Sequence, residues 1–142
     1  MKFESKKDTL FTILVLGINA LCIGIVIHVL FIKETVTQDY WGALIIVAVV
    51  LLLFWIFYGT HYELTKDALI YKSGPIRGKI SINRITEIEK GKTLWVGLKP
   101  ATSQKGLIIK YDKYNEIYIS PKTNDAFIKK ILELNSNIKI TE

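Results

Sequence analysis

Few residues of this chain have the types and spacing that enzymatic chemistry requires. The run Gly74–Lys79 hints at a phosphate-binding loop, but its spacing is one residue short and Ile80 replaces the required serine or threonine. Glu87 and Glu89 would lie on one face of a strand, as paired carboxylates can. Nothing apolar surrounds them in a way that would raise a pKa, so a solvated strand edge is the favoured interpretation.

Metal sites and nucleophiles are equally sparse. The two histidines, His28 and His61, fall at opposite ends of a pair of hydrophobic segments, so they cannot share a metal ion. The only cysteine, Cys22, lies inside the first of these segments and cannot form an internal disulfide or a cysteine-based zinc site. No serine, histidine and aspartate set can be assembled. The sequence therefore predicts no enzyme activity and no catalytic, cofactor-binding or metal-binding residues.

Two apolar segments dominate the first 60 residues. Leu10–Ile32 contains no formal charge, and as a helix it would reach about 34 Å, enough to cross a bilayer. The second segment is shorter, but aromatic residues at its ends suit a membrane interface. No small-residue cleavage site follows the first segment, which argues against a signal peptide. We therefore predict transmembrane helices over 10–32 and 41–59, with a buried helix pair of a soluble protein as the alternative.

Lysines are distributed unequally around these segments. The tail over 1–9 carries three lysines, whereas the loop over 33–40 carries one, and further basic residues follow the second segment. Positively charged residues near the ends of membrane spans tend to stay in the cytoplasm. We therefore predict a multi-pass protein of the cell membrane, with a cytoplasmic tail over 1–9, a short external loop over 33–40 and a cytoplasmic domain over 60–142.

The second half of the chain changes to short alternating segments. Six or seven strands separated by turn signals are indicated, and this series favours an antiparallel barrel or sandwich. The clearest of these strands are 61–64, 68–72, 78–82, 93–98, 107–111 and 116–120. Ser120 and Pro121 fit the N-cap and first position of an amphipathic helix of about 13 residues. The predicted fold class is thus a membrane helical hairpin followed by a β-rich, α+β domain.

The basic balance of the domain points to an anionic neighbour. This half of the chain carries the whole net charge of +6, which is typical of proteins that meet nucleic acid or an anionic surface. Because membrane spans precede the domain, the lipid surface is the simpler partner and no nucleic acid is expected. An ordinary solvated lysine-rich face is the alternative. The candidate membrane-surface residues are Lys66, Lys72, Arg77, Lys79 and Arg84.

Several short motifs of the domain, in their order and spacing, resemble a bacterial pleckstrin-homology-like (PH-like) domain family. The resemblance covers roughly residues 60–140. The motifs are Tyr62-Glu63-Leu64-Thr65, Leu69–Pro75, Ile80 with Ile82, Ile85 and Ile88, Ala101-Thr102-Ser103, Leu107–Tyr111, and Ile119-Ser120-Pro121-Lys122 with Phe127 and Asn135–Ile138. One departure is Gly106, which stands where the family pattern leads us to expect an arginine.

The resemblance implies a seven-stranded antiparallel barrel capped by a C-terminal helix, without catalysis or a cofactor. Family members are typically tethered by one or two N-terminal spans, and they include an immunity protein against the glycosylated bacteriocin sublancin. The resemblance therefore suggests a membrane-anchored immunity protein, which would bind a bacteriocin peptide or shield its membrane target. The alternatives are a tethered adaptor that binds a protein partner or anionic lipid, and a membrane-stress sensor. Candidate peptide contacts are Lys33, Glu34, Asp39, Tyr40 and Trp41.

Overall fold

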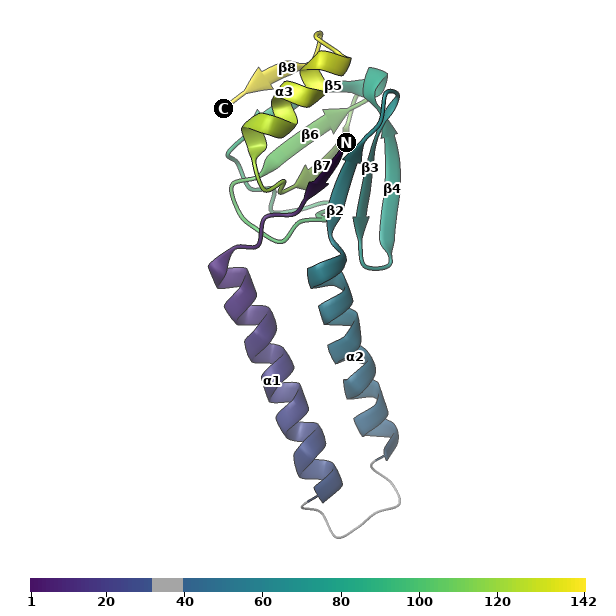
Figure 1. Ribbon diagram of the computed structural model, residues 1–142, viewed down its shortest axis with the longest axis vertical. Coiled ribbons are helices and arrows are strands. Elements are labelled where there is room, and N and C mark those ends of the chain that lie inside the picture. The colour runs from purple at the N-terminus through teal and green to yellow at the C-terminus, as the bar shows by residue number, and fades with distance from the viewer. Residues whose placement is uncertain (32–39) are drawn as a thin grey trace.

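Two long helices extend from one end of a β-rich domain in the computed structural model, which describes residues 1–31 and 40–142 (Figure 1). Helix α1 spans Thr9–Phe31 and helix α2 spans Tyr40–Gly59. Their most apolar windows have mean hydropathies of 2.7 and 2.6. Both helices are thus long and apolar enough to cross a membrane, which indicates that the protein is membrane-associated. The predicted external loop lies outside the described residues, except that Tyr40 begins α2.

The two helices touch along one side and expose the rest of their apolar surface. On α1, Val15 and Asn19 are buried, and the Asn19 amide donates a hydrogen bond to the Val15 carbonyl at 2.7 Å. Near the domain, the rings of Phe11 and Phe57 stack with their centroids 6.1 Å apart. The remaining large side chains of both helices are mostly exposed, as expected where lipid rather than protein covers them.

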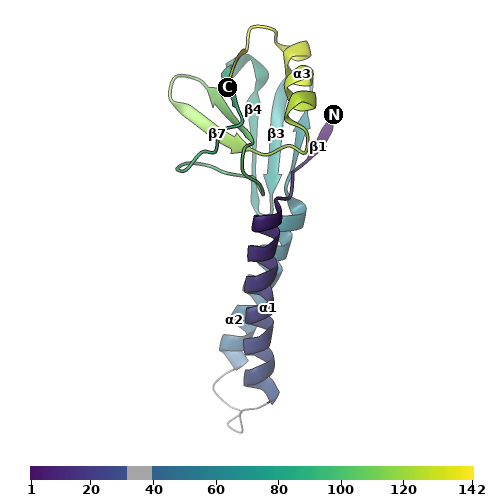
Figure 2. The same ribbon diagram turned by 90° about the vertical axis from the view of Figure 1, so that its left-hand side faces the viewer.

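The described part of the domain contains eight strands in two four-stranded sheets (Figures 1 and 2). The first sheet is antiparallel and has the order β1 (Lys2–Glu4), β2 (His61–Leu64), β3 (Ala68–Ser73), β4 (Ile76–Ser81). The second has the order β7 (Asn115–Ile119), β6 (Leu107–Tyr111), β5 (Ile85–Lys90), β8 (Lys139–Thr141). A 3-10 turn, Ile82–Arg84, joins the sheets, and helix α3 spans Asn124–Leu134.

Side chains from both sheets and from α3 form one hydrophobic core. Alternation along the strands places Tyr62 and Leu64 of β2 on the inner face, where both are buried. Helix α3 contributes Phe127 and Ile131, which are fully buried. The ring of Phe3 in β1 meets the ring of Phe127 edge to face, with centroids 5.2 Å apart. The α+β class predicted from the sequence is confirmed by this arrangement.

The N-terminal residues belong to the domain, which the sequence did not indicate. Residues 1–9 were expected to form a tail, yet Lys2–Glu4 forms strand β1, antiparallel to β2. Three residues are too few for an alternation pattern to stand out. The C-terminal strand β8 is equally short, and it pairs with β5 in parallel. The described domain therefore has eight strands and one parallel pair, where seven antiparallel strands were expected.

Two predicted elements also differ in position. Residues 93–98 form a loop between β5 and β6, in which Leu98 alone makes a β-bridge, with Ile117 of β7. The helix begins at Asn124 instead of Pro121. Residues 120–122 pair with the N-terminal segment, since Lys122 donates its backbone N–H to the Glu4 carbonyl at 2.9 Å. The predicted N-cap is thus engaged elsewhere.

Candidate membrane-facing site

Four buried hydroxyl groups lie where the chain passes between the helices and the domain. They belong to Ser5, Tyr62, Thr102 and Ser120, here named the hydroxyl cluster. The Ser5 hydroxyl oxygen lies 3.0, 2.8 and 2.9 Å from those of Tyr62, Thr102 and Ser120, respectively. The four residues come from separate segments of the chain, and a buried hydroxyl that loses its partner is costly. The cluster therefore fixes how the segment before α1 joins the domain.

Tyr62 extends the hydroxyl cluster to two backbone groups. Its phenol donates a hydrogen bond to the Pro100 carbonyl at 2.6 Å and accepts one from the Ser120 backbone N–H at 3.0 Å. Burial raises the pKa of the Tyr62 phenol, so the group stays protonated and able to donate. These hydrogen bonds indicate that the phenol holds the segments of the domain together next to the helices.

The turn between β3 and β4 packs against the domain end of α2. Gly74 has φ +55°, and a Cβ atom placed there would lie 2.7 Å from Cγ1 of Ile56. Only glycine combines this backbone conformation with this close approach. The segment that hinted at a phosphate loop is therefore the turn of a β-hairpin, and it has no helix after it to receive a phosphate.

Two of the candidate membrane-surface residues lie at this joint. Lys72 and Arg77 face each other across the β3–β4 hairpin. Together with Trp55 of α2 and His61 they line a cavity of about 270 Å³. Both cations are therefore held close to the domain end of α2.

The other three candidates are not brought together with them. Lys66 lies in the turn that follows β2, at the end of that strand away from α2. Lys79 pairs with Ile70 in the middle of the β3–β4 ladder. Arg84 forms an ion pair with Asp112, which lowers the pKa of that carboxyl group. The structure thus places two of the five candidate membrane-surface residues together and the other three apart from them.

The candidate peptide contacts lie mostly where the structure gives no description. Lys33, Glu34 and Asp39 are outside the described residues. Tyr40 begins α2, and Trp41 beside it is 77% exposed, at the end of α2 away from the domain. Whether these residues contact a peptide stays a prediction.

A basic cavity that the sequence did not reveal lies beside the first turn of α3. Its volume is about 270 Å³, and four of its lining residues are lysines. These lysines are Lys6, Lys90, Lys105 and Lys122. Asp125 forms an ion pair with Lys90 at 2.7 Å, and this contact raises the pKa of the Lys90 ammonium group. The lysines are far apart in the chain, so no local charge run marked the cavity.

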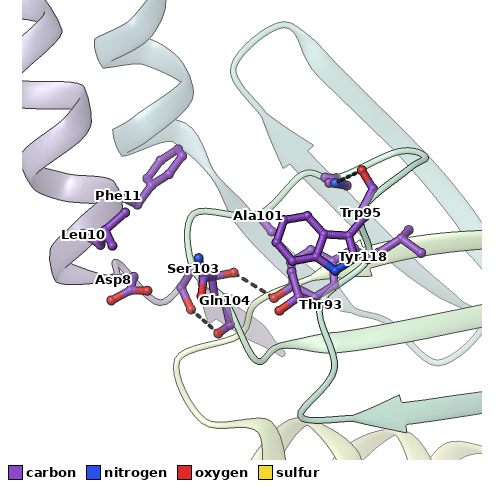
Figure 3. Close-up of a pocket in the computed structure, with 11 residues that line it drawn as sticks. Asp8, Leu10, Phe11, Thr93, Trp95, Ala101, Ser103, Gln104 and Tyr118 are labelled. Atoms are coloured by element: carbon purple, nitrogen blue, oxygen red, sulfur yellow. Dashed lines mark hydrogen bonds between the residues drawn. The ribbon is translucent and has the colours of Figure 1, made fainter.

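An apolar groove of about 170 Å³ separates the start of α1 from the loop over 91–106 (Figure 3). Leu10 and Phe11 line it on the helix side, and Trp95 and Tyr118 line it on the domain side. The Tyr118 hydroxyl donates to the Ser103 carbonyl at 2.8 Å. The groove therefore has one wall in α1 and one in the domain.

The close packing around Gly106 explains why this position has no side chain. A Cβ atom at this position would lie 2.2 Å from the carbonyl oxygen of Ile119. The Gly106 backbone N–H donates to the Tyr118 hydroxyl at 2.8 Å. No side chain fits here without a backbone shift, so this chain lacks the role of an arginine at this position.

The two strand carboxylates are engaged in ion pairs. Lys110 on β6 lies between Glu87 and Glu89, and it forms an ion pair with each. The Thr141 hydroxyl donates to Glu87 at 2.9 Å. The Thr141 and Lys110 hydrogen bonds lower the pKa of Glu87, and the Lys110 hydrogen bond lowers that of Glu89. Neither carboxyl group therefore has the raised pKa of a general acid. Within residues 1–31 and 40–142 no His, Cys, Asp and Glu side chains gather into a metal-binding group.

Comparison with known proteins assigns the fold family. The family described as Bacterial PH domain matches residues 60–135, more than half of the chain, and the chain belongs to this family. The chain is also similar to YyaB of Bacillus subtilis strain 168, an uncharacterized protein. The two are 29% identical over 142 residues, which cover 99% of this chain and 97% of YyaB. No solved structure matches the chain. PH domains are in general non-catalytic modules, and the matched region excludes β1 and β8.

Proposed function

We propose that the protein is a multi-pass adaptor of the cell membrane. Its helical hairpin holds a non-catalytic PH domain on the cytoplasmic surface, where the domain binds an anionic lipid or an acidic part of a protein partner. One observation carries the proposal: β1 precedes α1, β2 follows α2, and the two strands are paired neighbours in one sheet. The chain therefore leaves the domain through α1 and returns to it through α2.

Short connections keep the domain close to the bilayer. Between α2 and β2 there is a single residue, Thr60, and its hydroxyl donates to the Ile56 carbonyl at 2.6 Å. On the α1 side, the Lys7 ammonium lies 4.9 Å from the ring centroid of Phe57 and 4.2 Å from that of Tyr58. Such cation–π contacts join the two helix ends at the domain. The domain would accordingly have little freedom to swing away from the lipid surface.

The charge at the domain end supports the cytoplasmic side. Lys6 and Lys7 precede α1, and Lys72 and Arg77 lie beside the end of α2. Positively charged residues close to membrane spans favour the cytoplasm. The four lysines of the basic cavity add a concave surface that suits a phosphate or carboxylate group.

Cysteine labelling tests the topology. In a Cys22→Ala background, Thr37→Cys is expected to react with an impermeant thiol reagent on intact cells. Ser136→Cys is expected to react only after the membrane is permeabilised. The opposite pattern would place the domain outside the cell and contradict the proposal.

A charge-reversal pair tests the basic cavity. We expect Lys105→Glu combined with Lys122→Glu to lower the amount of phosphatidylglycerol that the full chain retains in native mass spectrometry. The matched control is Lys113→Glu combined with Lys129→Glu, which changes the net charge equally at exposed positions away from the cavity. Equal losses in both pairs would show that only overall charge matters. No retention by the parent protein would leave an acidic protein segment as the ligand to test.

Bacteriocin immunity, suggested by the resemblance of the sequence, stays a prediction because the described contacts do not bear on it. Cells that express the full chain are expected to tolerate a higher concentration of one bacteriocin in a panel that includes sublancin-like glycopeptides. An unchanged inhibitory concentration for every peptide, with membrane expression confirmed, would contradict immunity and leave the adaptor proposal standing.

A further inference from the structure

The loop over 91–106 exposes apolar side chains that belong to no sheet. Residues 93–98 alternate like a buried strand, yet Trp95 is 82% exposed and Val96 is 83% exposed. Adjacent exposed large apolar side chains commonly mark a surface that another apolar phase covers. The side chains of Trp95 and Val96 are therefore not part of the hydrophobic core of the domain.

Hydrogen bonds hold the two sides of this loop, while the side chains at its tip are exposed. The Leu98 carbonyl accepts a hydrogen bond from the Tyr118 backbone N–H at 3.0 Å, and Leu98 forms a bridge with Ile117. On the other side, the Thr93 hydroxyl accepts one from the Lys105 backbone N–H at 3.1 Å. The exposure of Trp95 and Val96 therefore belongs to an ordered loop whose two sides are fixed.

The tip of the loop lies beside the first turn of a membrane helix. Trp95 lines the apolar groove together with Leu10 and Phe11 (Figure 3). Because these two residues begin the apolar part of α1, the groove opens where that helix enters the bilayer. The Lys99 ammonium donates to the Trp95 carbonyl, which places a cation at the same level.

We propose that Trp95 and Val96 insert into the lipid interface, and that the groove between Trp95 and α1 is filled by lipid. The domain would then rest on the membrane at three points: α1, α2 and the tip of this loop. The inference rests on the proposed function only in requiring that the helices span a bilayer. Lipid is the expected occupant because the apolar surface of the groove continues into that of α1, and because indole rings favour the interface, with lysine beside them near the headgroups.

Tryptophan quenching in vesicles tests this contact on the full chain. The protein with Trp41→Phe and Trp55→Phe keeps Trp95 as its single tryptophan and is reconstituted into vesicles of phosphatidylcholine and phosphatidylglycerol. We expect acyl-chain-brominated lipid to quench Trp95, and aqueous acrylamide to quench it at least threefold less than a solvent-exposed reference. That reference is Tyr114→Trp in a background where all three native tryptophans are phenylalanine, since Tyr114 is 85% exposed in the β6–β7 turn.

Two outcomes would overturn the inference. Trp95 that behaves like the Tyr114→Trp reference would lie in water, and Trp95 protected from both quenchers would be covered by protein, such as a second copy of the chain. A third single-tryptophan protein, with Trp41→Phe and Trp95→Phe, reports on Trp55 within α2. Quenching of Trp55 without quenching of Trp95 would contradict the loop contact alone, whereas no lipid quenching of either would contradict the membrane-spanning helices as well.

Discussion

The helical hairpin and the β domain are specified in different ways. Helix α1 buries only Val15 and Asn19, and its other side chains need only to be apolar. The domain depends instead on particular partners that are far apart in the chain, such as Phe3 with Phe127. Many substitutions among apolar residues would leave the hairpin unchanged, whereas single changes in the domain would remove contacts that nothing else replaces. The junction between the two regions has the stricter requirements of the domain.

The largest expected effect comes from removing the N-terminal residues from the domain. A fusion that joins residues 1–8 to 60–142 through a short Gly-Ser linker should fold, because the Ser5 backbone N–H donates to the Thr60 carbonyl at 3.4 Å and the ends are close. Residues 60–142 alone should be less stable by about 4 kcal/mol, since the Phe3 ring is lost from the core. Urea unfolding followed by circular dichroism measures the difference. Equal stability of the two proteins would show that β1 is dispensable.

The next effect concerns the joint between the β3–β4 turn and α2. Gly74→Ala should destabilise the full chain in detergent by about 2–3 kcal/mol. The new methyl group would clash with Ile56, and alanine is also unfavourable at the positive φ of this position. Gly91→Ala is the matched control, since Gly91 has φ +77° with no atom near its Cβ position, and it should cost about 1 kcal/mol. Equal losses for the two variants in thermal unfolding would mean that the turn and α2 do not pack together.

A smaller effect is expected at the ion pairs of the second sheet. Glu89→Gln should destabilise the domain by about 1 kcal/mol at neutral pH, because Glu89 is mostly buried beside Lys110. The pKa of Glu89 lies below its ordinary value of 4.5, so this stability is fully present above that value and is lost as the pH falls through the lowered pKa. Urea unfolding at a series of pH values should therefore show the two proteins converging in acid.

The control for this pair is Glu4→Gln on β1, an exposed glutamate of the other sheet. It should change the free energy of unfolding by less than about 0.5 kcal/mol. A constant gap between Glu89→Gln and the parent protein at all pH values would show that the carboxylate charge is not what stabilises the sheet.

The same contrast explains which features the sequence could predict. The helices were predicted to within about a residue at their described ends, because composition alone marks an apolar span. Strands β2, β3, β6 and β7 were predicted from alternation. Strand β1 escapes prediction because three residues are too few to show alternation. Alternation over 93–98 wrongly predicts a strand because it cannot show that this segment meets β7 at Leu98 alone. The basic cavity was missed because its lysines meet only in the fold.

A designed disulfide tests most directly the claim that both ends of the hairpin enter one sheet. Lys2 and Glu63 are exposed and directly opposite in the β1–β2 ladder. The pair Met1 and Leu64 beside them exchanges both backbone hydrogen bonds, so Lys2 and Glu63 form the closer, non-hydrogen-bonded type of pair. The control pair is Lys2→Cys with Lys72→Cys on β3, one strand further away and beyond the reach of a disulfide.

The measurement is the reaction of native membranes with a polyethylene-glycol maleimide after mild oxidation, with Cys22→Ala in every protein. With Lys2→Cys and Glu63→Cys together, we predict that neither cysteine is modified until a reductant is added, while both cysteines of the control pair are modified without it. Free cysteines in both proteins would contradict the account, because residues before α1 and after α2 would then not share a sheet.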